Sequence, residues 1–258
     1  MHPILLKLGP LTIHTYGFFI ALGFIVGISF AKKQGAKLGI DTEKLMDLCF
    51  YMLLVGLIGA RLFYVAIEWD LYSKDLLEIF KIWNGGLVYF GGFISAMIFC
   101  VWYLKKHSIS FLKTIDLLAP SLAIAHSIGR LGCFSAGCCY GKATDLPWSV
   151  TFTHPDTLAV QNIAIHPTQL YSSFMNLIIF VMLVILSRKN KTDGMISVAY
   201  LFLYGIGRSL VEIFRGDDRG AFFLNIFSPA QTIGLSMVAF SIVFFCYLKF
   251  YKNYNENR

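Results

Sequence analysis

Long apolar stretches alternate with short polar connections along almost the whole chain. Most of these stretches approach the length of about 17–25 apolar residues with which a helix crosses a bilayer. The pattern therefore predicts seven membrane-spanning helices, placed at Tyr16–Ala31, Leu45–Val65, Leu87–Leu104, Ile115–Ile128, Leu170–Leu186, Met195–Phe214 and Ala230–Leu248. The fourth is short and carries polar residues, which also suits a tilted or re-entrant helix.

Composition points to an integral membrane protein of the all-α class. Of the 258 residues, 57% are hydrophobic and 14% are charged, whereas soluble domains carry about 25% charged residues. The net charge is +7, but the basic residues fall in short connections between apolar stretches, where they act as an orientation signal. We therefore expect a lipid bilayer as a partner and no nucleic acid. No cleavable signal peptide is recognised at the first apolar stretch, so it is expected to stay in place as a helix.

The charges of the connections alternate in character along the chain. The first, third and fifth connections and the C-terminal tail are basic, whereas the second carries Glu68, Asp70, Asp75 and Glu78. Because basic connections stay in the cytoplasm, the N-terminus is predicted outside and the C-terminus in the cytoplasm. We interpret residues 1–258 as a single transmembrane domain with a small external cap.

Two segments outside the apolar stretches carry local predictions. The cap is expected over Arg130–Gln169, in which "VTFT" at Val150–Thr153 has the composition of a short strand. Met1–Leu11 is expected to lie on the membrane surface as an amphipathic lead-in.

Several charged residues fall inside or at the ends of the apolar stretches, where a charge is costly and by default indicates a functional site. Arg61 and Arg130 lie near the outer ends of the second and fourth predicted helices, and a lone arginine there can also simply extend to the interface. Arg208 and Glu212 are four residues apart, so they share a helix face and can pair. Such a pair is either part of a site or a purely structural salt bridge. Arg215 follows near the outer end.

These arginines all fall in the outer half of the predicted membrane span. Converging guanidinium groups suit a phosphate, because each can donate two parallel hydrogen bonds. The predicted ligand is therefore a phospholipid headgroup. Polar side chains at similar depth are Tyr16, Tyr204, His166 and Gln169, while Thr168 is expected to cap the fifth helix. The six histidines are dispersed, so a histidine metal site is not indicated.

A set of motifs, in matching order and spacing, resembles the bacterial prolipoprotein diacylglyceryl transferases and spans nearly the whole chain. The motifs are "IHTYGFFIALGF" (Ile13–Phe24), "GLIGARLFYV" (Gly56–Val65), "NGGLVYFGGF" (Asn84–Phe93), "DLLAP" (Asp116–Pro120), "GRLG" (Gly129–Gly132), "HPTQLY" (His166–Tyr171), "YGIGRSLVEIFR" (Tyr204–Arg215) and "SPAQTIG" (Ser228–Gly234). The family's seven-helix topology, with the N-terminus outside, agrees with the orientation predicted from the loop charges.

The resemblance implies an activity and a set of residue roles. Members of this family move the diacylglyceryl group of phosphatidylglycerol onto the lipobox cysteine of secreted lipoprotein precursors in the bacterial cytoplasmic (inner) membrane, with no cofactor and no metal. Arg130 and Arg208 would hold the phosphate, Glu212 would orient Arg208, and Tyr16 and Tyr204 would line the pocket. The other expected substrate-binding residues are Arg61, Arg215, Gly129, Gly132, Gly141, His166 and Gln169.

The chain departs from the family's signature loop, which reads G-R-x-G-N-F-x-N-x-E-x-x-G. Here "GRLGCFSAGCCYG" has Cys133, Ala136 and Cys138 in place of the two asparagines and the glutamate, and Cys139 follows. The cysteines leave four interpretations open. These are a Cys133–Cys138 disulfide, a covalent intermediate on one thiol, a three-cysteine metal site that lacks a well-spaced fourth ligand, and plain packing at a tight turn.

A second departure concerns the proton acceptor. Phe90 stands where the family usually has a histidine that is often treated as the candidate base, so Tyr89, His126 or a cysteine thiolate would have to replace it. The departures leave two alternatives to the family reaction: transfer to a different thiol or hydroxyl acceptor, and lipid binding without catalysis. A transporter is disfavoured because the chain shows no internal repeat. A light-driven pump is disfavoured because the seventh apolar stretch contains no lysine.

Overall fold

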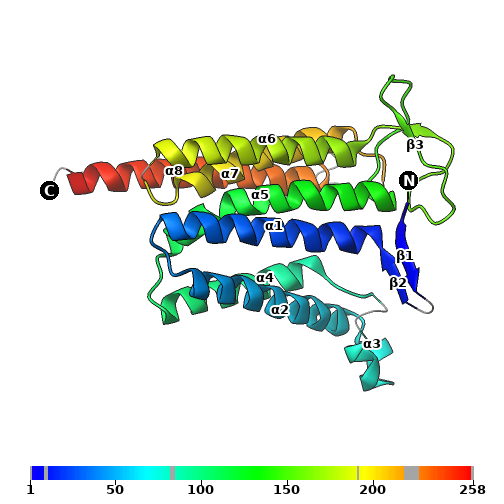
Figure 1. The fold of residues 1–258 in the computed structure, drawn as a ribbon, viewed down its shortest axis with the longest axis horizontal. Helices are drawn as coiled ribbons and strands as arrows, with labels where there is room; N and C mark the ends of the chain where they lie inside the picture. Colours follow the sequence, from blue (N-terminus) through cyan, green and yellow to red (C-terminus); the bar gives the residue numbers. More distant parts are fainter. Residues whose placement is uncertain (1, 9–10, 82–84, 191, 218–226, 257–258) are drawn as a thin grey trace. The chain divides into compact units, whose positions relative to one another are not determined.

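Long helices make up most of the computed structural model, which describes residues 2–8, 11–81, 85–190, 192–217 and 227–256 (Figure 1). The chain folds into two compact units, one of Met1–Ala31 with Ile115–Arg258 and one of Lys32–Thr114. The helices are α1 (Thr15–Lys37), α2 (Thr42–Ile67), α3 (Trp69–Tyr72), the 3-10 helix η1 (Leu76–Phe80), α4 (Tyr89–Lys106), α5 (Phe111–Ala136), α6 (Thr168–Lys189), α7 (Met195–Ile213) and α8 (Pro229–Glu256). The strands are β1 (Ile4–Leu8), β2 (Leu11–His14), β3 (Val150–Thr151) and β4 (Ala164–Ile165).

Among the described residues, six helices are long and apolar enough to cross a membrane: α1, α2, α5, α6, α7 and α8. The remaining predicted span corresponds to α4, which has 18 residues and ends in Lys105 and Lys106, so its apolar part is shorter. The fold is therefore that of an all-helical, multi-pass membrane protein.

The fourth predicted helix is much longer than its hydropathy indicates. Helix α5 has 26 residues and continues through Arg130 to Ala136, so the predictions of a short fourth segment and of a cap that begins at Arg130 are wrong. Its polar residues are paired with a neighbouring helix, since the Ser127 Oγ donates to the Ser173 carbonyl and the Ser173 Oγ donates back to the Ser127 carbonyl, both at 2.8 Å. Such pairing allows polar residues in a span, and a hydropathy window does not register it.

Asp116 of α5 caps helix α7 across the interface between the two helices. Its carboxylate accepts the backbone N–H of Gly194 at 2.7 Å and both the N–H and the hydroxyl of Ser197 at 2.8 and 2.7 Å. The first N–H groups of a helix have no partner within the helix and carry its positive dipole end, so a carboxylate there is stabilising. This contact gives the "DLLAP" motif a structural role.

The N-terminal segment is a hairpin, and the location of Met1–Leu11 on the membrane surface stays a prediction. Strands β1 and β2 pair antiparallel, and the Thr15 N–H donates to the Pro3 carbonyl at 2.9 Å where α1 begins. Pro3 lies directly before the strand, and proline disfavours a helical continuation but is tolerated at strand ends. The predicted strand at Val150–Thr153 is confirmed in its first half as β3, which pairs with β4.

Helices α1 and α5 approach closely through small residues. A side-chain carbon added at Gly23 would lie 2.7 Å from the Ala125 carbonyl oxygen, and one added at Gly27 would lie 2.9 Å from that of Ser121. Small residues at such crossings let two helix backbones pack together within a membrane. This packing positions the first turn of α1 next to the last turns of α5, where the candidate site lies.

Candidate functional site

Arg130 and His126 form the centre of the site, one helical turn apart on α5. The Arg130 Nε donates to the His126 Nε2 at 3.0 Å. Because a guanidinium has only donors, the imidazole accepts through Nε2, and its proton in a neutral ring lies on Nδ1. His126 was only one of three candidate bases by sequence; its spacing of four residues from Arg130 is the signal for the pair.

Helix α7 meets α5 at the same imidazole. The rings of His126 and Tyr204 lie 5.4 Å apart between centroids, and the charges of both Arg130 and Arg208 act on His126. His126 is therefore bonded to one of the two arginines expected to hold a phosphate, and it lies near the helix that carries the other. Tyr204 lies one turn before Arg208 on α7, as the sequence predicts.

The Arg208–Glu212 pair is confirmed as an ion pair. The Arg208 Nη1 donates to the Glu212 Oε2 at 2.7 Å, and the buried carboxylate also accepts the Ser228 hydroxyl at 2.9 Å through Oε1. Ser228 is in turn fixed at the start of α8, where its backbone N–H donates to the Gln231 Oε1 and its hydroxyl accepts the Gln231 N–H, at 3.1 and 3.2 Å. This is a capping box. The S-x-x-Q spacing in "SPAQ" was a signal for this contact that sequence analysis missed.

Arg215 lies just beyond α7 and is buried. Its Nε and Nη2 donate to the two carboxylate oxygens of Asp217, both at 2.7 Å. Burial lowers the pKa of this guanidinium, but the bonds to Asp217 and the nearby Cys139 outweigh it, so the pKa is raised overall and the charge is firmly held.

Gly141 lies where three backbone segments meet. It forms an antiparallel bridge with Arg215, and its N–H donates to the His166 carbonyl at 3.1 Å. A side-chain carbon at Gly141 would lie 2.5 Å from the His166 carbonyl oxygen and 2.9 Å from that of Phe214. Glycine is therefore required at this position, because any side chain would collide with these carbonyl oxygens. It links the turn after α5 to the end of α7.

The start of α6 supports this turn. The Thr168 hydroxyl donates to the Cys139 carbonyl at 2.7 Å, and the Gln169 Nε2 donates to the Cys138 carbonyl at 2.8 Å. The prediction that Thr168 caps α6 is wrong, because Pro167 occupies the N-cap position and the Thr168 hydroxyl bonds the cysteine turn instead. Gln169 is almost fully buried, and its Oε1 has no hydrogen-bond partner among the described residues.

The three cysteines of the signature loop come together on this turn. Cys133, Cys138 and Cys139 are free thiols, so the Cys133–Cys138 disulfide is not formed in this structure. Their Sγ atoms all lie within 4.8 Å of one another. Hydrogen bonds from the other two thiols, followed by the charges of Arg215 and Arg130, lower the pKa of Cys139 against the opposing effect of burial.

Tyr16 and the two glycines around Arg130 lie at the contact between α1 and α5. A side-chain carbon at Gly132 would lie 3.0 Å from the Tyr16 carbonyl oxygen, and one at Gly129 would lie 3.3 Å from the Ile20 side chain. The Tyr16 phenol interacts electrostatically with Arg130 and with all three cysteines. The glycines therefore bring the first turn of α1 close to Arg130.

His166 belongs to an aromatic cluster beside the turn. Its Nδ1 lies 3.2 Å from the Tyr171 hydroxyl, which accepts the Trp148 indole N–H at 2.8 Å. The His166 ring also packs 5.1 Å from that of Phe214. These contacts hold the cap against the ends of α6 and α7.

Arg61 lies in the other unit, where it organises a loop. Its buried guanidinium makes five hydrogen bonds to the backbone carbonyls of Glu78, Ile79, Lys81, Gly85 and Gly86. A guanidinium has five N–H groups, so these contacts use its donor capacity. Phe90 and Tyr89 lie in the same unit, at the start of α4, and are exposed.

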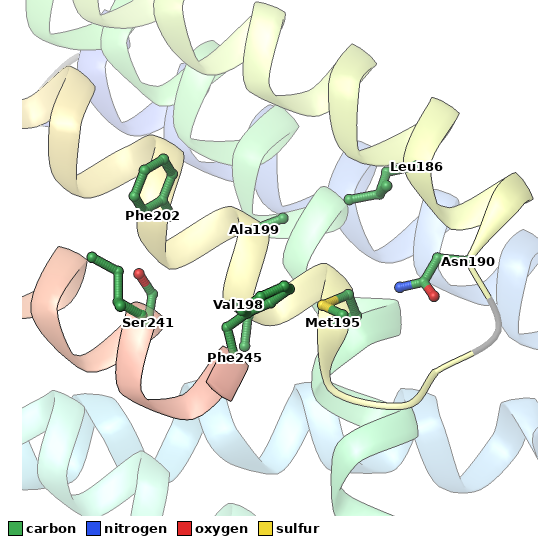
Figure 2. Close-up of a pocket in the computed structure, with 9 residues that line it drawn as sticks. Leu186, Asn190, Met195, Val198, Ala199, Phe202, Ser241 and Phe245 are labelled. Atoms are coloured by element: carbon green, nitrogen blue, oxygen red, sulfur yellow. The ribbon is translucent and has the colours of Figure 1, made fainter. Parts of the chain in front are cut away.

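A separate apolar cavity of about 460 Å³ lies between α7, α8 and the C-terminal end of α6. Figure 2 shows Val198 and Phe202 of α7 and Ser241 and Phe245 of α8 around it. None of the residues that line it is charged, and Arg208 is ten residues beyond Val198, or about 15 Å along the helix. The cavity is therefore not where the arginines would hold a phosphate.

Comparison with known proteins agrees with the resemblance seen in the motifs. The family described as prolipoprotein diacylglyceryl transferase matches residues 3–247. The phosphatidylglycerol–prolipoprotein diacylglyceryl transferase of Clostridium tetani is 36% identical over 248 residues, which cover 95% of this chain and 97% of that protein. The protein of the same name from Finegoldia magna is 35% identical over 229 residues, which cover 88% of each chain. That of Streptococcus suis is 37% identical over 221 residues, or 84% of this chain and 82% of its own. The chain therefore belongs to the prolipoprotein diacylglyceryl transferase family.

Proposed function

We propose that this protein transfers the diacylglyceryl group of phosphatidylglycerol to the lipobox cysteine thiol of secreted lipoprotein precursors, in the bacterial cytoplasmic membrane. The observation that carries the proposal is the hydrogen bond between Arg130 and His126, beside Tyr204 of the helix that carries Arg208, in a chain of this family. It combines two phosphate-binding groups with one group that can accept a proton.

The arginines would bind and activate the donor lipid. The phosphate of phosphatidylglycerol carries one negative charge as a diester and gains a second when it leaves as glycerol phosphate. Arg130 and Arg208 would stabilise that developing charge, which is worth most in a site shielded from water. Glu212, tied to Ser228, would keep Arg208 oriented, and Arg215 would add to the positive potential.

His126 is the base that the geometry favours. Its Nε2 is occupied by Arg130 in this structure, and a phosphate that draws the guanidinium away would free the lone pair. The lipobox thiol would then give its proton to Nε2, and the thiolate sulfur would attack the glycerol carbon that bears the phosphate oxygen. The carbon–oxygen bond breaks, its electron pair stays on the phosphate, and a thioether forms.

We propose that the protein crosses the membrane seven times, with α4 as the third span and the N-terminus outside. The last turns of α1, α4 and α6 carry basic residues, which supports a cytoplasmic location for these ends. The candidate site lies at the opposite ends of α1 and α6 and would face outward, where secreted precursors arrive.

Complementation in bacteria tests the proposed function. The chain would be expressed in a strain depleted of its own diacylglyceryl transferase, together with a reporter lipoprotein. We expect lipidation of the reporter to return with the wild-type chain and not with Arg130→Ala. If unmodified precursor accumulates despite normal expression and membrane insertion, the proposal is wrong, and the altered signature loop favours a different thiol or hydroxyl acceptor.

A further inference from the structure

We propose that Cys133, Cys138 and Cys139 form a binding site for one thiophilic metal cation, of the Cu(I) or Zn(II) class, at the end of α5. The transfer reaction proposed above needs no metal, so this site is a separate property of the chain. Sequence spacing alone offered no fourth ligand, and a metal was not expected. The inference comes from how the turn places the three sulfur atoms.

The sulfur atoms are already close to coordination distance. All three Sγ atoms lie within 4.8 Å of one another. Three thiolates around a zinc ion, each bonded at about 2.3 Å, are about 3.8–4.0 Å apart. The triad therefore needs to contract by less than about 1 Å to bind a metal, which rotation about the Cα–Cβ bonds can supply. Soft thiolate ligands favour Cu(I) and zinc over hard cations.

The backbone holds this arrangement at some cost. Gly137 and Cys139 both have left-handed backbones, with φ of 81° and 61°, and only the glycine adopts this conformation freely. The cysteine is kept there by the hydrogen bonds from Thr168 and Gln169 to the carbonyls of Cys139 and Cys138. A non-glycine residue held in a strained conformation by its surroundings is typical of a functional position.

Gln169 and two arginines surround the cysteine turn. The Gln169 carboxamide that bonds the Cys138 carbonyl has a buried Oε1 without a hydrogen-bond partner among the described residues, and a buried, unpaired oxygen is costly. Zinc prefers four ligands, whereas Cu(I) needs only the three sulfurs. Binding would displace the remaining thiol protons and leave the cluster net negative, and Arg130 and Arg215, whose charges act on Cys139, would balance it.

Metal titration of the purified full-length protein tests the site. The protein would be reduced, stripped with a chelator, and titrated without oxygen with Zn(II) or Cu(I) against a competing chromophoric chelator. We expect one equivalent of one of these metals per chain and, for Cu(I), a sulfur-to-metal charge-transfer band. Cys138→Ser and Cys139→Ser should each weaken binding at least about 100-fold, because outer-shell changes alone cost about 10–100-fold. Cys246→Ser, in α8, is the matched control and should bind as the wild type does.

The change in melting temperature on adding metal gives a second readout, because each variant is compared with its own metal-free form. Metal should raise the melting temperature of the wild type and of Cys246→Ser, and leave that of either loop variant unchanged, because only a chain that binds the cation is stabilised by it. Three results would overturn the proposal. In the first, the reduced wild type binds less than about one fifth of an equivalent of either metal. In the second, the Cys138→Ser/Cys139→Ser double variant binds as tightly as the wild type. In the third, a Cys133–Cys138 disulfide persists under the reducing conditions of the titration.

Discussion

Arg130 donates from its Nε to the Nε2 of His126 at 3.0 Å, one turn earlier on the same helix. The bond joins the group that would bind phosphate to the group that would accept the thiol proton. In this structure the guanidinium occupies the imidazole nitrogen, and a lipid phosphate, as a stronger acceptor, would compete for the guanidinium. Lipid binding and activation of the base would thus be coupled through the hydrogen bond between Arg130 and His126.

Removal of the base should slow the reaction without removing the lipid site. Gln at position 126 can still accept the hydrogen bond from Arg130 through its carbonyl, but it cannot take a proton. We expect His126→Gln to lower kcat by about 10²–10⁴-fold, the usual contribution of a general base, with little change in KM for phosphatidylglycerol. His154→Gln, in the cap, is the control. A kcat within threefold of wild type would exclude His126 as the base.

Loss of the carboxylate behind Arg208 should reduce both activity and stability. Glu212→Gln keeps the shape of the side chain but leaves Arg208 buried without its counter-charge. Breaking a buried ion pair costs about 3–5 kcal/mol in the free energy of unfolding, and kcat/KM should fall about 10²-fold. Steady-state kinetics and thermal unfolding of the same samples measure both. Unchanged kcat/KM in a destabilised protein would assign the pair a purely structural role.

Gly141 should not tolerate any side chain. Gly141→Ala would place a carbon 2.5 Å from the His166 carbonyl oxygen, so the turn that links α5 to Arg215 would have to move. We expect loss of activity and a lower melting temperature. Gly17→Ala is the matched control, because no atom of the described residues lies within 4 Å of the added carbon and alanine favours a helix over glycine by about 1 kcal/mol. Equal behaviour of the two variants would contradict the close approach.

Cys139 should remain reactive at a pH where ordinary thiols are protonated. Its pKa is lowered by hydrogen bonds from Cys133 and Cys138 and by the charges of Arg215 and Arg130, so the thiolate persists as the pH falls. An ordinary thiol loses about 50-fold of its thiolate between pH 8.5 and 6.5. We expect alkylation of Cys139 by iodoacetamide, in metal-free protein, to slow less than about threefold over that range. Peptide mapping would measure the alkylation rate of Cys139, with glutathione as the reference thiol. A parallel decline of the two rates would contradict a stabilised thiolate at Cys139.

Sequence alone predicts the helical framework well, because membrane spans are encoded in residue composition. It fails where polar residues are satisfied by partners that are distant in sequence. The Ser127–Ser173 and Asp116–Ser197 contacts make the polar ends of α5 suitable for a long helix. The N-terminal hairpin was missed because its stabilising contact, from Thr15 to Pro3, joins two segments that look like one apolar lead-in.

The site was predictable in its residue types but not in its connections. The spacing of Arg208 and Glu212 predicts their ion pair, since four residues complete one helical turn. The link from Glu212 to Ser228 depends on how α7 and α8 pack. The meeting of the three thiols depends on the support that the start of α6 gives to the turn after α5. No local sequence pattern contains these contacts. His126 is central only because Arg130 belongs to the same helix, whereas the sequence placed that arginine at the start of the cap.

The most direct measurement is mass spectrometry of a reporter lipoprotein precursor after incubation with the purified protein and phosphatidylglycerol. We expect the lipobox cysteine to gain the mass of one diacylglyceryl group as a thioether, with one glycerol phosphate released per modified chain, and Arg130→Ala to abolish both. If the precursor stays unmodified while the well-folded wild-type protein binds phosphatidylglycerol, the protein is not a diacylglyceryl transferase for this precursor.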